Sequence, residues 1–167
     1  MNRRFTLIIA LFFATFCLSP GTATANVEDQ TEERHVAILS VYKSFEAALA
    51  DAKKISKASK VPFSMEDRIY DKKRGIIFPD DYPDEAFQGG YLARREDKTI
   101  LPGSDDLVAY LSIEKSDAYD GFKPGFYMVV AGIRETRAEA LKQADQFKKW
   151  APAAYVKKTR IYMGCLH

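Results

Sequence analysis

Two strand-and-helix units dominate the pattern of apolar and polar positions along this chain of 167 residues. The β-branched and aliphatic run over 35–42 predicts a strand, and apolar positions spaced three and four apart over 44–59 predict an amphipathic helix. The run over 126–133 predicts a second strand, and the spacing over 136–150 predicts a second helix. The chain therefore contains the same local arrangement twice.

The two units superimpose without a gap when 92 is added to each residue number. Ser44 at the expected start of the first helix falls on Thr136, and Leu49 on its apolar face falls on Leu141. Thr136 and Glu139 also have the spacing of a capping box. The alternative is that the likeness is general, because any two strand-and-helix units share caps and an apolar stripe. Because strand, cap, stripe and following strand keep one register here, the pattern favours a structural repeat.

Each unit is expected to end in a second strand, over 61–70 and over 153–162. Two such units predict an α+β fold, in which two β-α-β repeats form a mainly antiparallel sheet with two helices on one face. The β-rich stretch inserted between them, at about 71–123, is too long for a plain loop and is expected to form extra sheet or a subdomain against the core. Its expected short strands are Gly75–Phe78, Tyr91–Arg95 and Leu107–Glu114.

Strand alternation makes both faces of the predicted sheet apolar, so we expect both to be covered. The helices cover one face, and the inserted stretch is the candidate cover for the other. Alternation assigns Val36, Ile38, Ser40, Met128, Val130 and Gly132 to one face. It assigns Ala37, Leu39, Val41, Tyr127, Val129, Ala131 and Ile133 to the opposite face.

The first 25 residues have the pattern of a cleaved secretory signal peptide. Arg3 and Arg4 precede an apolar run of 14 residues, and Ala23-Thr24-Ala25 supplies the small residues of a cleavage site. A membrane anchor is the alternative, but 14 helical residues reach only about 21 Å across a hydrocarbon core of roughly 30 Å. We therefore expect a periplasmic protein without a membrane span after cleavage. Residues 26–33 would form a flexible lead-in and 34–167 a single domain.

The charge balance adds a contrast between the two ends of the chain. The total of 25 basic and 23 acidic residues, a net charge of +2, gives no electrostatic reason to expect nucleic acid as a partner. Residues 26–122 carry 14 basic and 20 acidic side chains, whereas residues 123–167 carry nine basic and three acidic ones. Either these parts attract each other, or the basic part faces an anionic partner.

Candidate reactive groups are few. Signal cleavage would leave Cys165 as the sole cysteine, either a free thiol or an intermolecular bridge. Cys165 and His167 would need a third ligand, such as His35, to hold a metal, and a half-buried thiol at a strand end is the simpler interpretation. The chain has no hydrolase, metalloprotease, dinucleotide or P-loop motif. We therefore expect no enzyme activity, metal or cofactor.

Three segments of the second unit, Gly125–Ile133, Thr136–Leu141 and Ala153–Lys157, resemble the SPOR (sporulation-related repeat) family of bacterial envelope domains. The resemblance implies two β-α-β repeats that bind peptidoglycan glycan strands stripped of their stem peptides. Many members carry a Gln on the glycan-facing sheet face, two residues before the strand-end glycine, where this chain has Val130.

A polysaccharide site requires aromatic faces for sugar rings and polar side chains for hydroxyl groups. Each candidate also has an ordinary structural interpretation, because tyrosines pack at core edges and basic side chains are common on surfaces. The candidate contacts are Tyr42, Tyr91, Arg94, Arg134, Lys158, Arg160 and Tyr162.

Two functions remain open from the sequence. The first is a non-catalytic periplasmic protein that binds peptidoglycan, which the secretion signal and the resemblance favour. The second is an envelope protein–protein interaction module, such as an inhibitor or immunity-type partner of a secreted enzyme. The covered apolar sheet and the long insertion favour the second.

Overall fold

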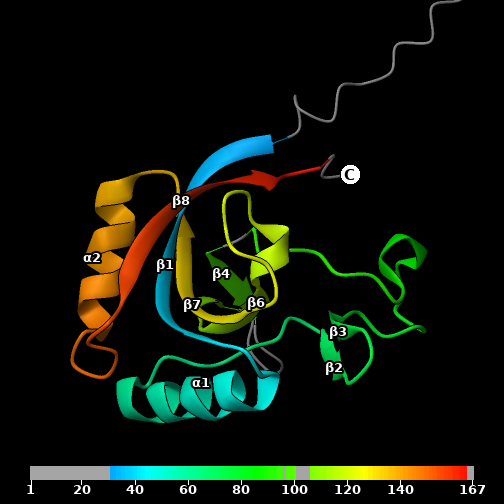
Figure 1. Cartoon of the computed structure of the whole chain (residues 1–167), viewed down its shortest axis with the longest axis horizontal. Helices are drawn as coiled ribbons and strands as arrows, with labels where there is room; N and C mark the ends of the chain where they lie inside the picture. Colours follow the sequence, from blue (N-terminus) through cyan, green and yellow to red (C-terminus); the bar gives the residue numbers. More distant parts are fainter. Residues whose placement is uncertain (1–30, 96, 101–105, 165–167) are drawn as a thin grey trace, which may run out of the picture.

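A four-stranded sheet with two helices on one face forms the centre of the computed structural model, which describes residues 31–95, 97–100 and 106–164 (Figure 1). The spatial order is β6-β7-β1-β8, and every neighbouring pair is antiparallel. The predicted α+β class with a mainly antiparallel sheet is confirmed. The predicted signal peptide, Cys165 and His167 lie outside the described residues. The strands are β1 (Thr31–Tyr42), β6 (Ser112–Lys115), β7 (Tyr127–Arg134) and β8 (Tyr155–Tyr162).

Both helices begin where their caps predict. In α1 (Phe45–Ser59), the Ser44 hydroxyl accepts a hydrogen bond from the backbone N–H of Ala47 at 3.2 Å. In α2 (Arg137–Phe147), Thr136 and Glu139 form the complete capping box. These bonds satisfy amides that would otherwise lack partners in the first turn.

The helix face of the sheet carries the larger core. Leu39 of β1 and Val129 of β7 pack against α1 and α2, together with buried residues of both helices. Alanines on the helices allow close approach to the sheet. The helix residues buried in this core are Phe45, Ala48, Ala52, Ile55, Ala144 and Phe147.

The predicted strand over 61–70 is wrong, because β6 takes the place beside β7 that this strand would have occupied. Phe63 forms only a single bridge, to Leu111, and Pro62 lacks a donor for a strand ladder. Glu66 and Asp67 both have left-handed backbone, with φ of 52° and 62°, which turns the chain out of an extended path. With β6 in that place, the described elements follow the β-α-β-β-α-β arrangement.

Two register shifts between β1 and β7 change which side chains share a face. Ala37 pairs with Gly132 and Ile38 with Val130, so Ala131 is an extra residue in β7, and Leu39 is similarly skipped in β1. Ser40 therefore lies on the helix face, where its hydroxyl donates to Asp51 at 2.5 Å. Ile133 packs instead on the opposite face. Simple alternation assigned both residues to the other side.

The predicted insertion is divided into two parts by β6. We call residues 60–111 the α1–β6 connection and residues 116–126 the β6–β7 loop. The predicted strand at 91–95 is not formed, and the predicted run 107–114 is split between β5 and β6. The connection contains β2 (Ile69–Asp71), β3 (Gly75–Ile77), the 3₁₀ helix η2 (Glu85–Phe87), β4 (Lys98–Ile100) and β5 (Leu107–Ala109), and the loop contains η3 (Ser116–Ala118).

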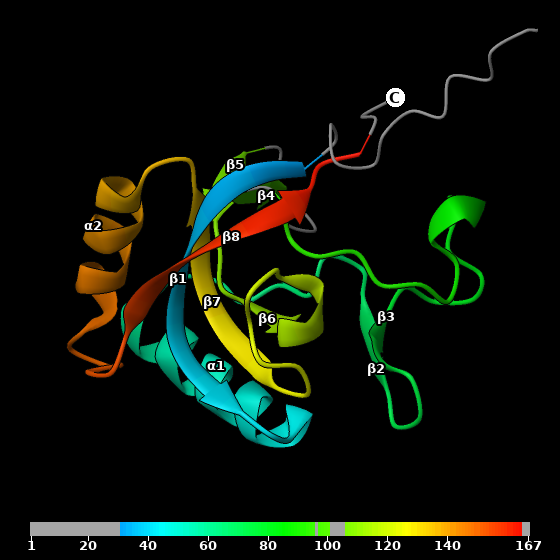
Figure 2. The same cartoon turned by 45° about the horizontal axis from the view of Figure 1, so that its top comes forward.

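The second face of the sheet, which we call the far face, is largely covered by the connection and the loop. Figure 1 and Figure 2 show β2, β3 and η2 standing out from the side of the sheet away from α2. Val36, Ile38 and Val130 on this face are fully buried beneath Tyr119 and Ala93. The expectation that both apolar faces are covered is confirmed.

β1 begins at Thr31, three residues earlier than the expected domain start. Residues 31–33 pair with Arg160, Ile161 and Tyr162 of β8, so part of the expected lead-in belongs to the sheet. None of the helices in the described part of the chain is both long and apolar enough to cross a bilayer.

Candidate functional site

A buried polar cluster on β6 holds the connection against the far face. The carboxylate of Glu114 accepts hydrogen bonds from both terminal nitrogens of Arg68, each at 2.9 Å. The Tyr91 hydroxyl donates to it at 2.7 Å, and the backbone N–H of Arg94 donates at 3.1 Å. Three positions of the connection are thus bonded to one side chain of the sheet. We call Glu114, Arg68, Tyr91 and Arg94 the Glu114 cluster.

The ionisation states of Glu114 and Tyr91 favour the hydrogen bonds that hold the connection against the far face. Burial alone would raise the pKa of Glu114, but the charge of Arg68 and the hydrogen bonds from Arg68 and Tyr91 lower it below its ordinary value. Burial, with the carboxylate of Glu114 nearby, raises the pKa of Tyr91 well above its usual range. Glu114 is therefore ionised and Tyr91 protonated at neutral pH, each in a stable hydrogen-bonded state.

The part of the far face that remains uncovered forms a groove of about 260 Å³. Strands β1, β7 and β8 form its floor, and the β6–β7 loop forms one wall. We call it the sheet-face groove. Its lining residues are Val41, Ser116, Phe122, Lys123, Phe126, Met128, Tyr155 and Lys157.

Local hydrogen bonds hold the wall of the sheet-face groove. The carboxylate of Asp117 accepts from the backbone N–H of Gly125 at 2.6 Å, and the hydroxyl of Ser116 accepts from that of Phe126 at 3.0 Å. Gly125 has a φ of 84°, a left-handed conformation that glycine adopts without strain. Lys157 of β8 donates to the carbonyl of Gly121 at 2.6 Å, which ties the loop to the sheet edge.

The groove combines aromatic surface with positive charge. The ammonium of Lys157 lies 4.2 Å from the ring centroid of Phe122, and that of Lys123 lies 5.8 Å from that of Phe126. Within the described part of the chain, neither lysine has a carboxylate within ion-pair distance. Tyr155 is 43% exposed, and partial burial raises its pKa, so its hydroxyl stays protonated and able to donate.

Comparisons with known proteins do not identify the chain. No family model, curated protein or solved structure matches it. Among the described residues, no three His, Cys, Asp or Glu side chains are grouped as metal ligands.

Two of the predicted contact residues, Tyr91 and Arg94, belong to the buried Glu114 cluster. Besides its backbone bond to Glu114, Arg94 donates side-chain hydrogen bonds to the carbonyls of Tyr110 and Asp97, each at 3.0 Å. Its guanidinium also lies 3.6 Å from the ring centroid of Tyr110. These side chains are engaged within the fold, and we do not carry them forward as ligand contacts.

The other predicted residues lie on the helix face. Arg134, Lys158 and Arg160 come together with Tyr162 where β1 and β8 extend beyond α2, since Arg134 and Lys158 both pair with His35 of β1. Arg134 forms an ion pair with Asp97, and Lys158 forms one with Glu33 at 2.6 Å. Tyr42, half-buried at the end of β1, packs at the edge of the helix-face core.

Sequence reasoning missed the residues of the sheet-face groove. Phe126, Tyr155 and Lys157 stand inside the segments that carry the family resemblance, which is the signal that could have identified them. Phe122 and Lys123 border the predicted insertion, and only the fold brings them beside β8. Five of the eight lining residues of the groove lie in the basic last part of the chain, 123–167.

Proposed function

We propose that this chain is a non-catalytic periplasmic protein that binds peptidoglycan glycan strands in the sheet-face groove. The observation that carries the proposal is the groove itself, where three aromatic side chains line the uncovered part of the sheet together with two lysines that have no carboxylate partner among the described residues. The resemblance of the second unit to SPOR domains and the apolar pattern of residues 1–25 support the ligand class and the location.

The chemistry of such a glycan suits the groove. A strand stripped of stem peptides exposes sugar-ring faces, hydroxyl groups and the carboxylates to which the peptides were attached. Phe126 and Tyr155 supply flat apolar surface for a ring face, and the Tyr155 hydroxyl supplies a hydrogen-bond donor. Lys123 and Lys157 supply charge for the carboxylates, and within the described part of the chain neither lysine has to leave an ion pair to do so.

The test is sedimentation with purified sacculi, with and without amidase trimming. We expect the protein to pellet with trimmed sacculi and expect Tyr155→Ser to bind about threefold to tenfold more weakly, because it loses one aromatic surface. Tyr162→Ser is a matched control, since Tyr162 lies on the same strand with nearly equal exposure, 45% against 43%, but on the other face. If Tyr162→Ser abolishes pelleting and Tyr155→Ser does not, the groove assignment is wrong.

The extent of covering on the far face favours a second candidate function. The connection and the β6–β7 loop bury most of this face, and β2, β3 and η2 stand out from the body as a separate surface (Figure 2). Such a surface suits an envelope protein–protein interaction module. Failure of the protein to pellet with trimmed sacculi would overturn glycan binding and leave this second function as the better proposal.

A further inference from the structure

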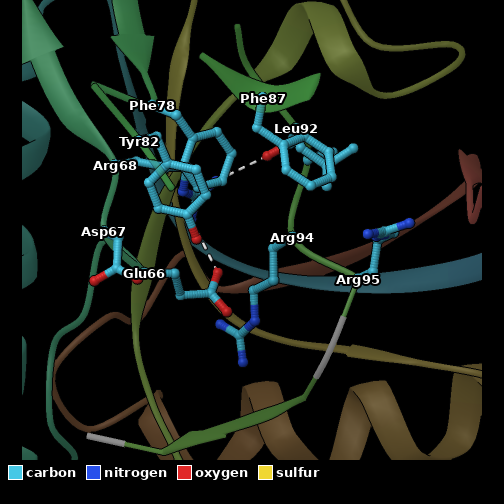
Figure 3. A pocket seen from close by; sticks show the side chains of 10 residues that line it. Glu66, Asp67, Arg68, Phe78, Tyr82, Phe87, Leu92, Arg94 and Arg95 are labelled. Atoms are coloured by element: carbon cyan, nitrogen blue, oxygen red, sulfur yellow. Dashed lines mark hydrogen bonds and ion pairs between the residues drawn. The ribbon is translucent and has the colours of Figure 1, made fainter. Parts of the chain in front are cut away.

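A second hollow, distinct from the sheet-face groove, lies within the α1–β6 connection (Figure 3). Its volume is about 260 Å³, and we call it the connection pocket. Three aromatic side chains, Phe78, Tyr82 and Phe87, line it together with the carboxylates of Glu66 and Asp67. The remaining lining residues are Arg68, Leu92, Ala93, Arg94 and Arg95. The nature of its ligand depends on which of these charged side chains already bond to other groups of the protein.

The aromatic wall is a continuous surface. The ring centroids of Phe78 and Tyr82 lie 4.6 Å apart, and those of Phe78 and Phe87 lie 5.6 Å apart. Phe78 is buried behind the other two rings, which are half-exposed. The negative faces of such rings attract a cation placed over them.

The arginines of the connection pocket are engaged with other groups. All five N–H donors of Arg68 are used: two bonds go to Glu114, one goes to Glu66, and two go to backbone carbonyls. Arg94 is buried against Tyr110, and Arg95 donates to the carbonyl of Met163. An anionic ligand would therefore have to break existing bonds to recruit these side chains.

Asp67, in contrast, is an exposed carboxylate at the pocket with no hydrogen-bond or ion-pair partner in the described part of the chain. Its neighbour Glu66 contributes a carboxylate that accepts a hydrogen bond from Arg68 at 3.1 Å. The η2 side of the wall adds the exposed acids Asp81, Asp84 and Glu85 near Tyr82 and Phe87 in the sequence. Asp67 is thus the carboxylate at the pocket that can take a cation as a new partner without giving up a bond to another described residue.

We propose that the connection pocket binds the alkylammonium side chain of a lysine presented by a basic partner protein. The aliphatic stem would lie against the aromatic wall, and the ammonium would lie over the rings and beside Asp67. This interaction is independent of the proposed glycan binding, because it uses no residue of the sheet-face groove. It would give the protruding connection a partner of defined charge.

The test is a titration of the full protein, followed by NMR of its backbone amides and aromatic side chains. The probes are n-butylammonium and blocked lysine (N-acetyl-lysine methylamide), and n-butanol is the uncharged control with the same stem. We expect saturable shifts at Phe78, Tyr82 and Phe87 with both cations, weakened by added salt, and none with n-butanol at equal concentration.

Two variants test the roles of charge and ring. Asp67→Asn removes the carboxylate but suits the left-handed backbone, because Asn also tolerates a positive φ. We expect it to weaken binding about twofold to fivefold, and Phe87→Leu to do the same by removing one ring. Glu46→Gln is the control, since it removes one negative charge from the exposed first turn of α1, outside the pocket.

Three outcomes would overturn the proposal. The first is the absence of saturable shifts with either cation while the variants remain folded by circular dichroism. The second is an equal loss of affinity in Asp67→Asn and Glu46→Gln, which would indicate a general charge effect. The third is tighter binding of N-acetylglucosamine at the same resonances with no effect of Asp67→Asn, which would make the pocket a sugar site.

Discussion

Removing the charge of Glu114 should destabilise the fold more than removing the Thr136 cap. In Glu114→Gln, the guanidinium of Arg68 stays buried at 1% exposure with Glu66 as its remaining carboxylate. At 2.9 Å the lost attraction is about 6 kcal/mol for an effective dielectric constant near 20, before desolvation is counted. Breaking one side of a buried pair typically costs about 3–5 kcal/mol. We expect a loss in that range.

The assay is equilibrium denaturation by urea, followed by two signals. The single tryptophan, Trp150, packs against Phe147 in the helix-face core, so its fluorescence reports on that layer. Hydrogen exchange of the connection reports on the part that Glu114 anchors. A loss below about 1 kcal/mol by both signals would refute the view that the cluster anchors the connection. The double variant Arg68→Met/Glu114→Gln should lose less than the sum of the two single variants.

The same cluster predicts the pH dependence of stability. Because the folded state lowers the pKa of Glu114, its contribution is complete above the pKa of an unfolded glutamate, about 4.3, and is lost as the pH falls through the lower folded value. The difference in unfolding free energy between the native protein and Glu114→Gln should therefore shrink below about pH 4. A difference that stayed constant from pH 7 to pH 3 would contradict this assignment of charge.

Three further substitutions test local features of the fold by thermal or urea denaturation. Thr136→Ala removes the capping box and should cost about 0.5–2 kcal/mol, whereas Thr136→Ser should retain most of the stability. Lys60→Gly should stabilise by up to about 1 kcal/mol, because Lys60 ends α1 with a φ of 66°; a loss of stability would contradict this. Gly132→Ala places a methyl group against the side-chain amide of Gln143 and the carboxylate of Asp97 and should cost about 1–3 kcal/mol, less when combined with Gln143→Ala.

Features set by neighbouring residues could be predicted from the sequence. The Thr136–Glu139 box and the Ser44 cap depend on residues three apart, and both helices start where these predict. The apolar alternation of β1 and β7 likewise placed most of their side chains correctly. It failed after Leu39 in β1 and after Ala131 in β7, since an extra residue inserted in a strand leaves no mark in an apolar run.

Features that depend on distant partners could not be predicted. Arg68 and Glu114 are 46 positions apart, and the sequence marks neither as the partner of the other. The predicted strand over 61–70 had suitable side chains, but its backbone turns at Glu66 and Asp67. The sheet-face groove was missed for the same reason, because Phe122 and Tyr155 meet only when the β6–β7 loop folds back against β8.

The choice of β6 as the edge strand explains why the connection covers the far face beside the sheet-face groove. The side chain of Glu114 points to the far face, so the connection has to lie on that face to bring Arg68 and Tyr91 within hydrogen-bond distance. It covers Val36, Ile38 and Val130, which would otherwise present an apolar surface to water. The β6–β7 loop then supplies one wall of the groove on the remaining sheet. Deleting the connection would therefore expose an apolar face and unpair Glu114, so a shortened chain should aggregate before it could bind a longer ligand.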